Sequence, residues 1–322
     1  MYPFKFEPLL KQTIWGGDKI NSYKKLANDL TQVGESWELS GVPGHESIVA
    51  NGVWKGTSLS RLIERFGAEI VGTENHARFG TTFPLLVKFI DARLDLSIQV
   101  HPDDELARQR HGCPGKNEMW YVISAEPHAR LCAGLSRPID AAEYERRIHD
   151  GSIEEVLCFH ELHAGDVFNI PAGRVHSIGA GAFIAEIQQT SDITYRIYDF
   201  NRRDANGQLR ELHTELAKDA IDYTTLPDYR THYAPDTNVP VELVASPYFT
   251  TSLYDLTEEM TCDYSELDTF IIYICTEGAA VLCDDQGNKE PIRQGETVLV
   301  PACTRTVSIC PEGHVTLLES WV

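Results

Sequence analysis

Two histidines, a glutamate and a glutamine occur at positions from which a β-rich fold could gather them around one metal ion. His101 and His176 each end a short segment that is typical of a strand or of a strand with its turn, and Glu118 opens a further apolar run. Gln99 and His101 are two residues apart, so on a strand their side chains project to the same side. Imidazole, carboxylate and amide ligands without a thiolate suit Zn²⁺ and also admit Mn²⁺, Fe²⁺ or Co²⁺. The set predicts a catalytic metal site in an enzyme that acts on a polar small molecule.

Strands and helices must position these residues, and the pattern of apolar residues predicts several of these elements. Residues 83–90 form an apolar run short enough to be a strand buried on both faces. Its one charge, Lys88, is out of place there and is therefore of interest. Alternation predicts a strand over 36–40, and helical spacing predicts helices over 57–70 and 211–220.

The chain also contains a weak internal repeat. Residues 295–302 resemble residues 165–172 at an offset of 130 (295 − 165), and residues 276–277 resemble residues 125–126 at an offset of 151 (276 − 125). The difference of 21 positions (151 − 130) falls on 137–158, where the pattern is helical. Two related β modules follow, the first with an α-helical insertion.

The second copy differs from the first at the proposed ligands. At these offsets His176 corresponds to Thr306, and Glu118 corresponds to Thr269. If His176 and Glu118 served only packing, there would be less reason for both to be replaced in the second copy. The first module is therefore expected to hold the metal and the second to be structural.

Proline spacing suggests where the modules divide. Pro227, Pro235 and Pro240 mark 225–240 as a linker. We expect an N-terminal catalytic module over 1–224, with its helical insertion near 137–158, and a C-terminal module over 241–322 that lacks metal ligands.

Composition narrows the class of protein. The 322 residues carry a formal net charge of −20, which opposes binding to nucleic acid or to an anionic membrane surface. The eight cysteines include no Cys-x-x-Cys pair, so free and mostly buried thiols are expected. No apolar stretch follows the first basic residue as in a signal peptide, and none is long enough to span a bilayer. These features predict a cytoplasmic protein with a small-molecule substrate; the oligomeric state stays open.

Several ordered motifs together resemble the type I mannose-6-phosphate isomerases, a family of the cupin superfamily. The resemblance implies a mainly β fold of two cupin-type modules, each a double-stranded β-helix, with a small α-helical insertion. The likeness covers nearly the whole chain and matches the short bacterial branch. The motifs are Trp15-Gly16-Gly17, Gly34-Glu35-Ser36-Trp37-Glu38, Ser97-Ile98-Gln99-Val100-His101-Pro102, Gly115-Lys116-Asn117-Glu118-Met119-Trp120-Tyr121, the Ile170-Pro171-Ala172-Gly173-x-x-His176 turn and the segment 186–199.

The resemblance also implies roles for individual residues. It implies one Zn²⁺ per chain, with Mn²⁺, Co²⁺ or Fe²⁺ as alternatives. The implied metal ligands are Gln99, His101, Glu118 and His176.

Four further positions match functional positions of the family. Arg196 occupies the active-site arginine position, and Lys116 matches a lysine expected to transfer a proton or to contact substrate. Ser97 and Lys88 match positions that hold the substrate, with its phosphate as the expected partner. Many relatives have His-Lys-Pro-Glu where this chain has Gly-Lys-Asn-Glu over 115–118, so a role for that histidine is missing here.

The implied reaction interconverts D-mannose 6-phosphate and D-fructose 6-phosphate through an enediol, and the residue chemistry suits it. Moving a proton between C1 and C2 needs a base with a pKa near neutrality and a group that stabilises a developing oxyanion. A lysine near a cation can supply the first, as can a metal-bound water. Arg196 stays protonated, so it can hold an oxyanion or a phosphate but cannot act as a base.

Other interpretations remain open at this point. Lys88 and Arg196 could form structural salt bridges, because 48 acidic residues offer partners. The chain could be another cupin enzyme, such as a glucose-6-phosphate isomerase or an Fe²⁺ dioxygenase. It could also be a cupin that binds sugar phosphates or regulates without turnover.

Overall fold

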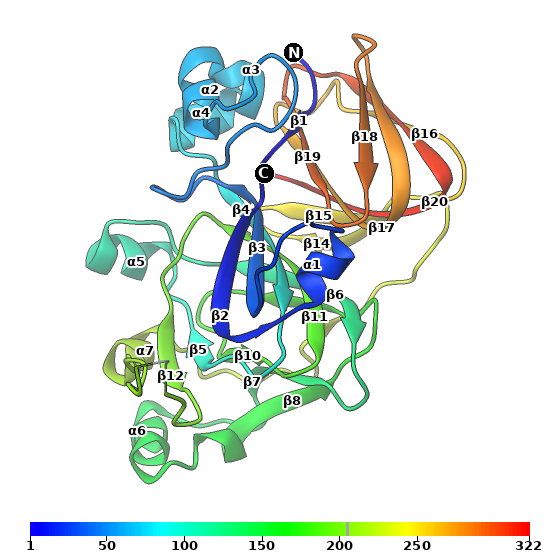
Figure 1. Ribbon diagram of the computed structural model, residues 1–322. Helices are drawn as coiled ribbons and strands as arrows, with labels where there is room; N and C mark the ends of the chain where they lie inside the picture. The colour runs from blue at the N-terminus through cyan, green and yellow to red at the C-terminus, as the bar shows by residue number, and fades with distance from the viewer. Residues whose placement is uncertain (204–205) are drawn as a thin grey trace.

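A computed structural model describes residues 1–203 and 206–322 (Figure 1). Within these residues the strands form three sheets, and the expected mainly β, cupin-type architecture with a helical insertion is confirmed. In Figure 1 the C-terminal strands form the upper part together with β1 and helices α2, α3 and α4, and the strands from β2 to β12 lie below them.

The seven-stranded and five-stranded sheets are built from strands between residues 9 and 231. In spatial order the first contains β13 (Arg230–Thr231), β9 (Val167–Ile170), β6 (Glu118–Ala125), β11 (Ala182–Gln189), β4 (Leu85–Asp91), β3 (Val33–Ser40) and β2 (Leu9–Gly17). The second contains β12 (Tyr195–Tyr198), β5 (Ile98–Val100), β10 (His176–Ile178), β7 (Arg130–Leu135) and β8 (Leu157–Glu161).

The third sheet has eight strands and joins the two ends of the chain. It contains β1 (Phe4–Lys5), β19 (Thr297–Val300), β17 (Ile271–Asp284), β20 (Thr306–Trp321), β15 (Thr250–Leu256) and β14 (Val241–Ala245), with β16 (Met260–Asp263) on β20 and β18 (Lys289–Arg293) on β17. The helices are α1 (Lys19–Tyr23), α2 (Leu59–Phe66), α3 (Ala68–Val71), α4 (Thr73–Phe79), α5 (Asp104–His111), α6 (Ala141–Asp150) and α7 (Thr214–Ala220), with a 3₁₀ helix at Ile153–Val156.

The two N-terminal sheets face each other across a shared apolar cluster. Ile90, Trp120 and Ile184 point into it from the seven-stranded sheet. Leu131 and Ile178 reach it from the five-stranded sheet. This barrel-like arrangement positions the ends of β5, β6 and β10 close together.

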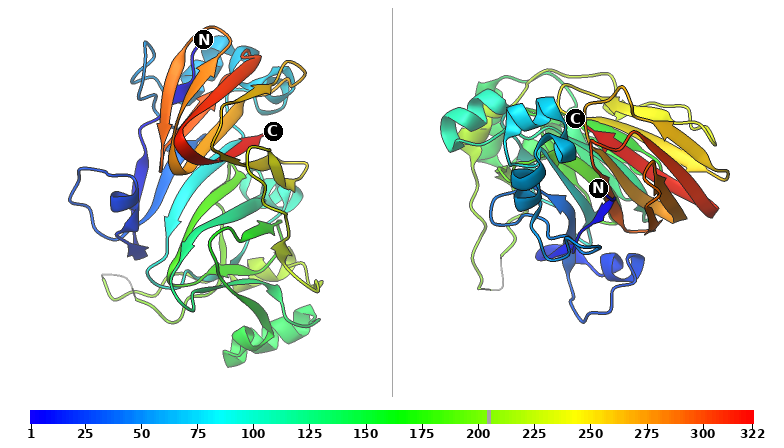
Figure 2. Two further views of the ribbon diagram at one scale, coloured as in Figure 1. Left: turned by 90° about the vertical axis from the view of Figure 1, so that its right-hand side faces the viewer. Right: turned by 90° about the horizontal axis from the view of Figure 1, so that it is seen from above.

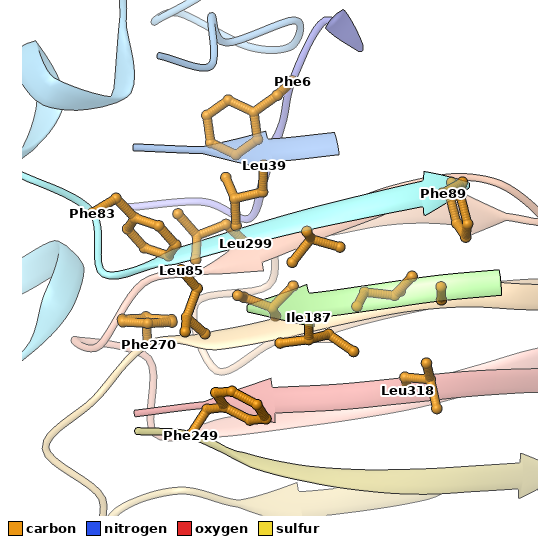
Figure 3. Packing of buried hydrophobic residues seen from close by; sticks show 14 of the residues in the cluster. Phe6, Leu39, Phe83, Leu85, Phe89, Ile187, Phe249, Phe270, Leu299 and Leu318 are labelled. Atoms are coloured by element: carbon orange, nitrogen blue, oxygen red, sulfur yellow. The ribbon is translucent and has the colours of Figure 1, made fainter. Parts of the chain in front are cut away.

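The opposite face of the seven-stranded sheet packs on the C-terminal sheet. Figure 3 shows Leu85 and Ile187 of the seven-stranded sheet opposite Leu299 and Leu318 of the eight-stranded C-terminal sheet. Every residue of β4 and β11 is buried, as expected for strands covered on both faces. The strand predicted over 83–90 is thereby confirmed.

The predicted helices are present, with shifted boundaries. The segment 57–70 forms α2 and α3, which are separated at Gly67, where φ is +52°. These helices lie beside the C-terminal sheet (Figures 1 and 2). The segment 211–220 is helical only over α7. Within 137–158, α6 and the 3₁₀ helix confirm the helical insertion, and its last two residues already belong to β8.

The segment expected as a linker has structural roles of its own. Arg230 and Thr231 form β13, which extends the seven-stranded sheet by pairing with β9. The hydroxyl of buried Tyr229 donates to the carbonyl oxygen of Leu135 at 3.0 Å. Proline and turn residues signalled a break in strands there, but they could not reveal this edge pairing.

The internal repeat is visible in the strand pairing, with one correction. Glu118 pairs with Ile170 between β6 and β9, and Ile271 pairs with Val300 between β17 and β19. Glu118 therefore corresponds to Ile271 and not, as expected, to Thr269. From residue 118 to 125 the first copy is two residues longer than the second copy from 271 to 276 (125 − 118 = 7; 276 − 271 = 5), which shifts the offset. The second module still has no carboxylate at this place.

Two expectations from composition can be compared with the structure. All eight cysteines are free thiols, but only Cys132 and Cys275 are buried and the other six are half-buried. The expectation of mostly buried thiols is therefore wrong, because most of them lie on sheet faces or loops that solvent reaches. No helix in the described ranges has the length and apolar character to cross a bilayer.

Candidate active site

Three of the residues singled out above converge at one point of the N-terminal barrel. His101 directly follows β5, Glu118 opens β6 and His176 opens β10. Their candidate ligand atoms lie within 4.8 Å of one another, and each residue is at most 1% exposed. The Nε2 atom of His176 is 3.3 Å from Oε1 of Glu118, and Nε2 of His101 is 3.5 Å from Oε2.

Backbone contacts orient both imidazoles. Nδ1 of His101 is 2.8 Å from the carbonyl oxygen of Ile193, and Nδ1 of His176 is 2.8 Å from that of Arg174. A carbonyl only accepts, so Nδ1 carries the proton and Nε2 presents its lone pair to the centre. Burial lowers the pKa of His176 to about 3 and that of His101 well below its usual value. Both rings are therefore neutral at pH 7, the form that binds a metal.

The carboxylate at the centre is hydrogen-bonded through one of its two oxygens. Oε1 of Glu118 is buried without a hydrogen-bond partner among the described residues. Burial raises the pKa of Glu118 to about 7 in spite of the Lys116 ammonium group. That ammonium group lies 2.6 Å from Oε2 of Glu118 and 2.9 Å from Nε2 of His101. Two neutral imidazoles and one carboxylate form a donor set that fits a divalent metal ion.

Gln99 lies at the edge of this cluster. It pairs with His176 between β5 and β10, and its Nε2 is 3.3 Å from Nε2 of that histidine. The hydroxyl of Ser97 donates to its Oε1 at 3.4 Å. A flip of the amide, which exchanges two atoms of similar size, would present Oε1 to the centre.

A buried ion pair adjoins the cluster. Lys88 and Glu186 are paired residues of β4 and β11, and their charged atoms are 2.9 Å apart. The indole of Trp120 donates to the other Glu186 oxygen at 2.9 Å. Burial opposes both charges, but Lys88 outweighs it and lowers the pKa of Glu186 to about 2, while Glu186 raises that of Lys88. The salt bridge foreseen as an alternative for Lys88 is present.

A cavity of about 350 Å³ opens beside these groups. Five residues chosen from the sequence line it: Lys88, Ser97, Gln99, Lys116 and Arg196. Nine other residues line it, and none of them was given a role from the sequence. Six of the nine are polar or aromatic, namely Trp15, Glu35, Glu186, Asp192, Thr194 and Arg210. Five of these six lie in segments that carry the family resemblance, with Trp15 in 15–17, Glu35 in 34–38 and the other three in 186–199, so that signal was available. Nothing in the spacing of Arg210 pointed to this cavity.

Arg196, on β12, is held in the cavity wall by its own backbone and by a neighbouring segment. Its amide donates to Nδ1 of His213 at 3.2 Å, and its Nη1 donates to the carbonyl oxygen of Glu211 at 2.9 Å. Its Nε is buried without a partner among the described residues. Burial and then the Arg210 guanidinium lower the pKa of Arg196. No salt bridge to Arg196 is found in the described part of the chain, so the structural alternative for this arginine finds no support.

The segment 115–118 shows why this chain departs from the commoner family pattern. A Cβ at Gly115 would lie 2.5 Å from backbone atoms of Asp103 and Asp104, so histidine does not fit there. Asn117 donates to Gln189 at 2.7 Å and accepts from the amide of Ala172 at 2.9 Å. These bonds anchor the start of β6 on both sides, a function that proline could not perform.

Known proteins resemble this chain in sequence and in fold. Residues 3–124 match the family model described as phosphomannose isomerase type I, catalytic domain. The chain is 32% identical to mannose-6-phosphate isomerase ManA of Bacillus subtilis (strain 168) over 93% of both chains. It is 33% identical to mannose-6-phosphate isomerase of Streptococcus mutans over 92% of both chains.

Solved structures agree with the sequence matches. The crystal structure of the mannose 6-phosphate isomerase from Bacillus subtilis superposes with a TM-score of 0.89 at 31% identity, covering 100% of both chains. A phosphomannose isomerase variant from Salmonella typhimurium gives 0.80 at 16% identity and supports the fold alone. Because the two sequence relatives exceed 30% identity over more than nine-tenths of their lengths, the chain belongs to the type I phosphomannose isomerase family.

Proposed function

We propose that this chain interconverts D-mannose 6-phosphate and D-fructose 6-phosphate as a metal-dependent aldose–ketose isomerase. The observation that carries the proposal is the junction of the buried His101–Glu118–His176 cluster with a polar cavity lined by Lys116 and Arg196. The names of the relatives at 32% and 33% identity support the same reaction.

One divalent ion per chain, which we propose to be Zn²⁺, would be held by Gln99, His101, Glu118 and His176. Mn²⁺, Co²⁺ and Fe²⁺ are alternatives, since the same donor set accepts them. When bound, the ion supplies Lewis-acid polarisation of the substrate's carbonyl and hydroxyl oxygens.

We also propose roles for four further residues. We assign the proton transfer between C1 and C2 to Lys116; its Nζ lies 2.9 Å from Nε2 of His101, and the residue lines the cavity, which supports this role. Arg196 remains cationic and can hold an oxyanion or the phosphate of the substrate. Ser97 and Lys88, which also line the cavity, bind the substrate.

An assay after metal removal tests the proposal. The protein is stripped with chelator, shown by circular dichroism to stay folded, and supplied with Zn²⁺, Mn²⁺ or Co²⁺. Fructose 6-phosphate is expected from mannose 6-phosphate only in metal-loaded samples. His176→Ala is expected to lose at least about 100-fold in kcat/KM together with its bound metal.

Three results would redirect the proposal. Folded, metal-loaded protein that binds sugar phosphate without converting it would indicate a binding or regulatory cupin. Conversion of glucose 6-phosphate in preference, or consumption of oxygen, would indicate another cupin enzyme. Full activity of His176→Ala in metal-depleted buffer would rule out the metal site.

A further inference from the structure

Two arginines on either side of a short loop share one buried aspartate. Arg203 and Leu209 form an isolated antiparallel bridge, which places their neighbours Arg202 and Arg210 across from each other. Asp199, only 4% exposed, accepts from both guanidinium groups. The ion pairs lower the pKa of Asp199 although burial opposes this, so the group is a carboxylate at neutral pH.

The two arginines use their nitrogens differently. Arg202 directs one nitrogen at Asp199 and another at the carbonyl oxygen of Asp95, so it ties the loop to the segment that precedes Ser97. Arg210 donates from Nε to Oδ2 of Asp199 at 2.7 Å and from Nη2 to Oδ1. Among the described residues, Nη1 of Arg210 makes no hydrogen bond to protein. Arg202 is thus a structural tie, and Arg210 keeps donor groups free.

Only Arg210 of this pair lines the cavity, and it does so together with Arg196. Arg196 also has an unpaired buried Nε, and the proximity of Arg210 lowers its pKa. Two guanidinium groups that repel each other and retain free N–H groups are suited to an anion with several oxygens. Lys88, by contrast, has its charge compensated by Glu186 at 2.9 Å.

We propose that Arg210 and Arg196 bind the phosphate group of the substrate, and that Asp199 is a positioning residue that holds Arg210 toward the cavity. The inference rests on the proposed function and deepens it. It assigns the phosphate end of the sugar to this side and leaves Lys88 and Ser97 to contact the sugar itself.

Asp199→Asn tests the positioning role by the direction in which it changes KM for mannose 6-phosphate. Removal of a negative charge near a phosphate would, by Coulomb's law alone, tighten binding. Loss of positioning predicts the opposite: KM for mannose 6-phosphate rises roughly 10-fold or more, with kcat within about twofold. Glu215→Gln, which removes a carboxylate that is 81% exposed on α7, is the matched control and should leave KM unchanged.

Inorganic phosphate gives a readout that does not require turnover. Isothermal titration calorimetry should show phosphate binding to the wild-type protein and a roughly 10- to 100-fold weaker affinity in Arg210→Met. Arg210→Lys should recover only part of it, because a lysine lacks the two-pronged contact. Thermal unfolding of each variant checks that it is folded.

The outcomes separate this inference from the proposed function. An active wild-type enzyme whose KM and phosphate affinity are unchanged in folded Arg210→Met would overturn the inference and leave the isomerase proposal intact. Phosphate binding that depends on Arg210, in a protein without isomerase activity, would support the inference and overturn the proposed function. Tighter phosphate binding in Asp199→Asn would exclude the positioning role.

Discussion

A lysine in the middle of a fully buried strand is the clearest example in this protein of a residue whose environment decides its role. Lys88 is 5% exposed and lies in β4, where apolar neighbours cover both faces. It remains charged because Glu186 lies opposite on β11 and is itself fixed by the indole of Trp120. The pair gives the cavity wall fixed charges of both signs, which an apolar pair could not provide.

Breaking this ion pair should give a stability loss that depends on pH. Lys88→Met is expected to lower the free energy of unfolding by about 3–5 kcal/mol at pH 7, because Glu186 stays buried without its cation. In the wild-type protein the pKa of Glu186 is about 2, below that of the unfolded chain, so its contribution holds above about pH 4.5 and fades as the pH falls toward 2. Without Lys88 burial raises that pKa, the folded variant takes up a proton, and the deficit shrinks between pH 7 and 5.

Urea titrations at pH 7 and pH 5 measure the free energy of unfolding of the wild-type protein and of Lys88→Met. The exposed pair of Lys218 with Glu145 offers a control, and Lys218→Met should show little change at either pH. An equal deficit for Lys88→Met at both pH values would contradict the assigned protonation of Glu186.

At the scale of elements, a short loop and the strand after it position the proton-transfer candidate. Asp104 of α5 accepts from the amide of Gly115 at 2.8 Å and from the Gln189 side chain at 3.1 Å. Gln189 in turn accepts from Asn117, which flanks Lys116. The start of β6 is therefore tied to α5, to the end of β11 and to the turn after β9.

Asn117→Ala is expected to weaken this anchoring. It removes two side-chain hydrogen bonds of a residue that is 7% exposed, which should cost about 1–3 kcal/mol and lower kcat roughly 10-fold while the metal stays bound. Asp140→Ala is the control, since Asp140 caps the distant helix α6 and its loss should cost about 1 kcal/mol without changing kcat. Isomerase kinetics, metal analysis and urea unfolding provide the three readouts. Unchanged kcat in Asn117→Ala would show that the hydrogen bonds of Asn117 do not contribute to catalysis.

For the whole molecule, the two β modules share one core. The rings of Phe83 and Phe270, one from each half, have centroids 4.5 Å apart (Figure 3). The N-terminal strand β1 pairs with β19 of the C-terminal sheet. We propose 1–224 and 241–322 as modules related by repetition, and we expect them to fold as one cooperative unit.

Phe270→Ala tests this shared core. Removal of the buried ring should lower the free energy of unfolding by about 3–5 kcal/mol, with a single transition and unchanged kcat at 25 °C. The half-buried Phe79 is the control, and its truncation should cost less. A truncated chain of residues 1–240 should fail to fold, because its exposed sheet would lose the C-terminal cover. Two separate unfolding transitions would show instead that the modules are independent.

Much of the fold was predictable because it depends on local periodicity. Burial on both faces leaves a continuous apolar run, and β4 was predicted from one. The helical insertion followed from a mismatch between two repeat offsets. The pairing of β1 with β19 and the edge strand β13 were not predictable, because strands as short as two residues leave no pattern in the sequence.

The sequence by itself determined which residues could bind a metal, since the types and motif spacing of His101, Glu118 and His176 are local properties. Only the tertiary structure decided that their ligand atoms lie within 4.8 Å and that their cation partner is Lys116. The tertiary structure alone decided that Arg210 lines the cavity and that Lys88 forms an ion pair with Glu186. The physical reason is that charge pairing depends on separation in space, which loop paths and strand register set and which residue spacing along the chain does not encode.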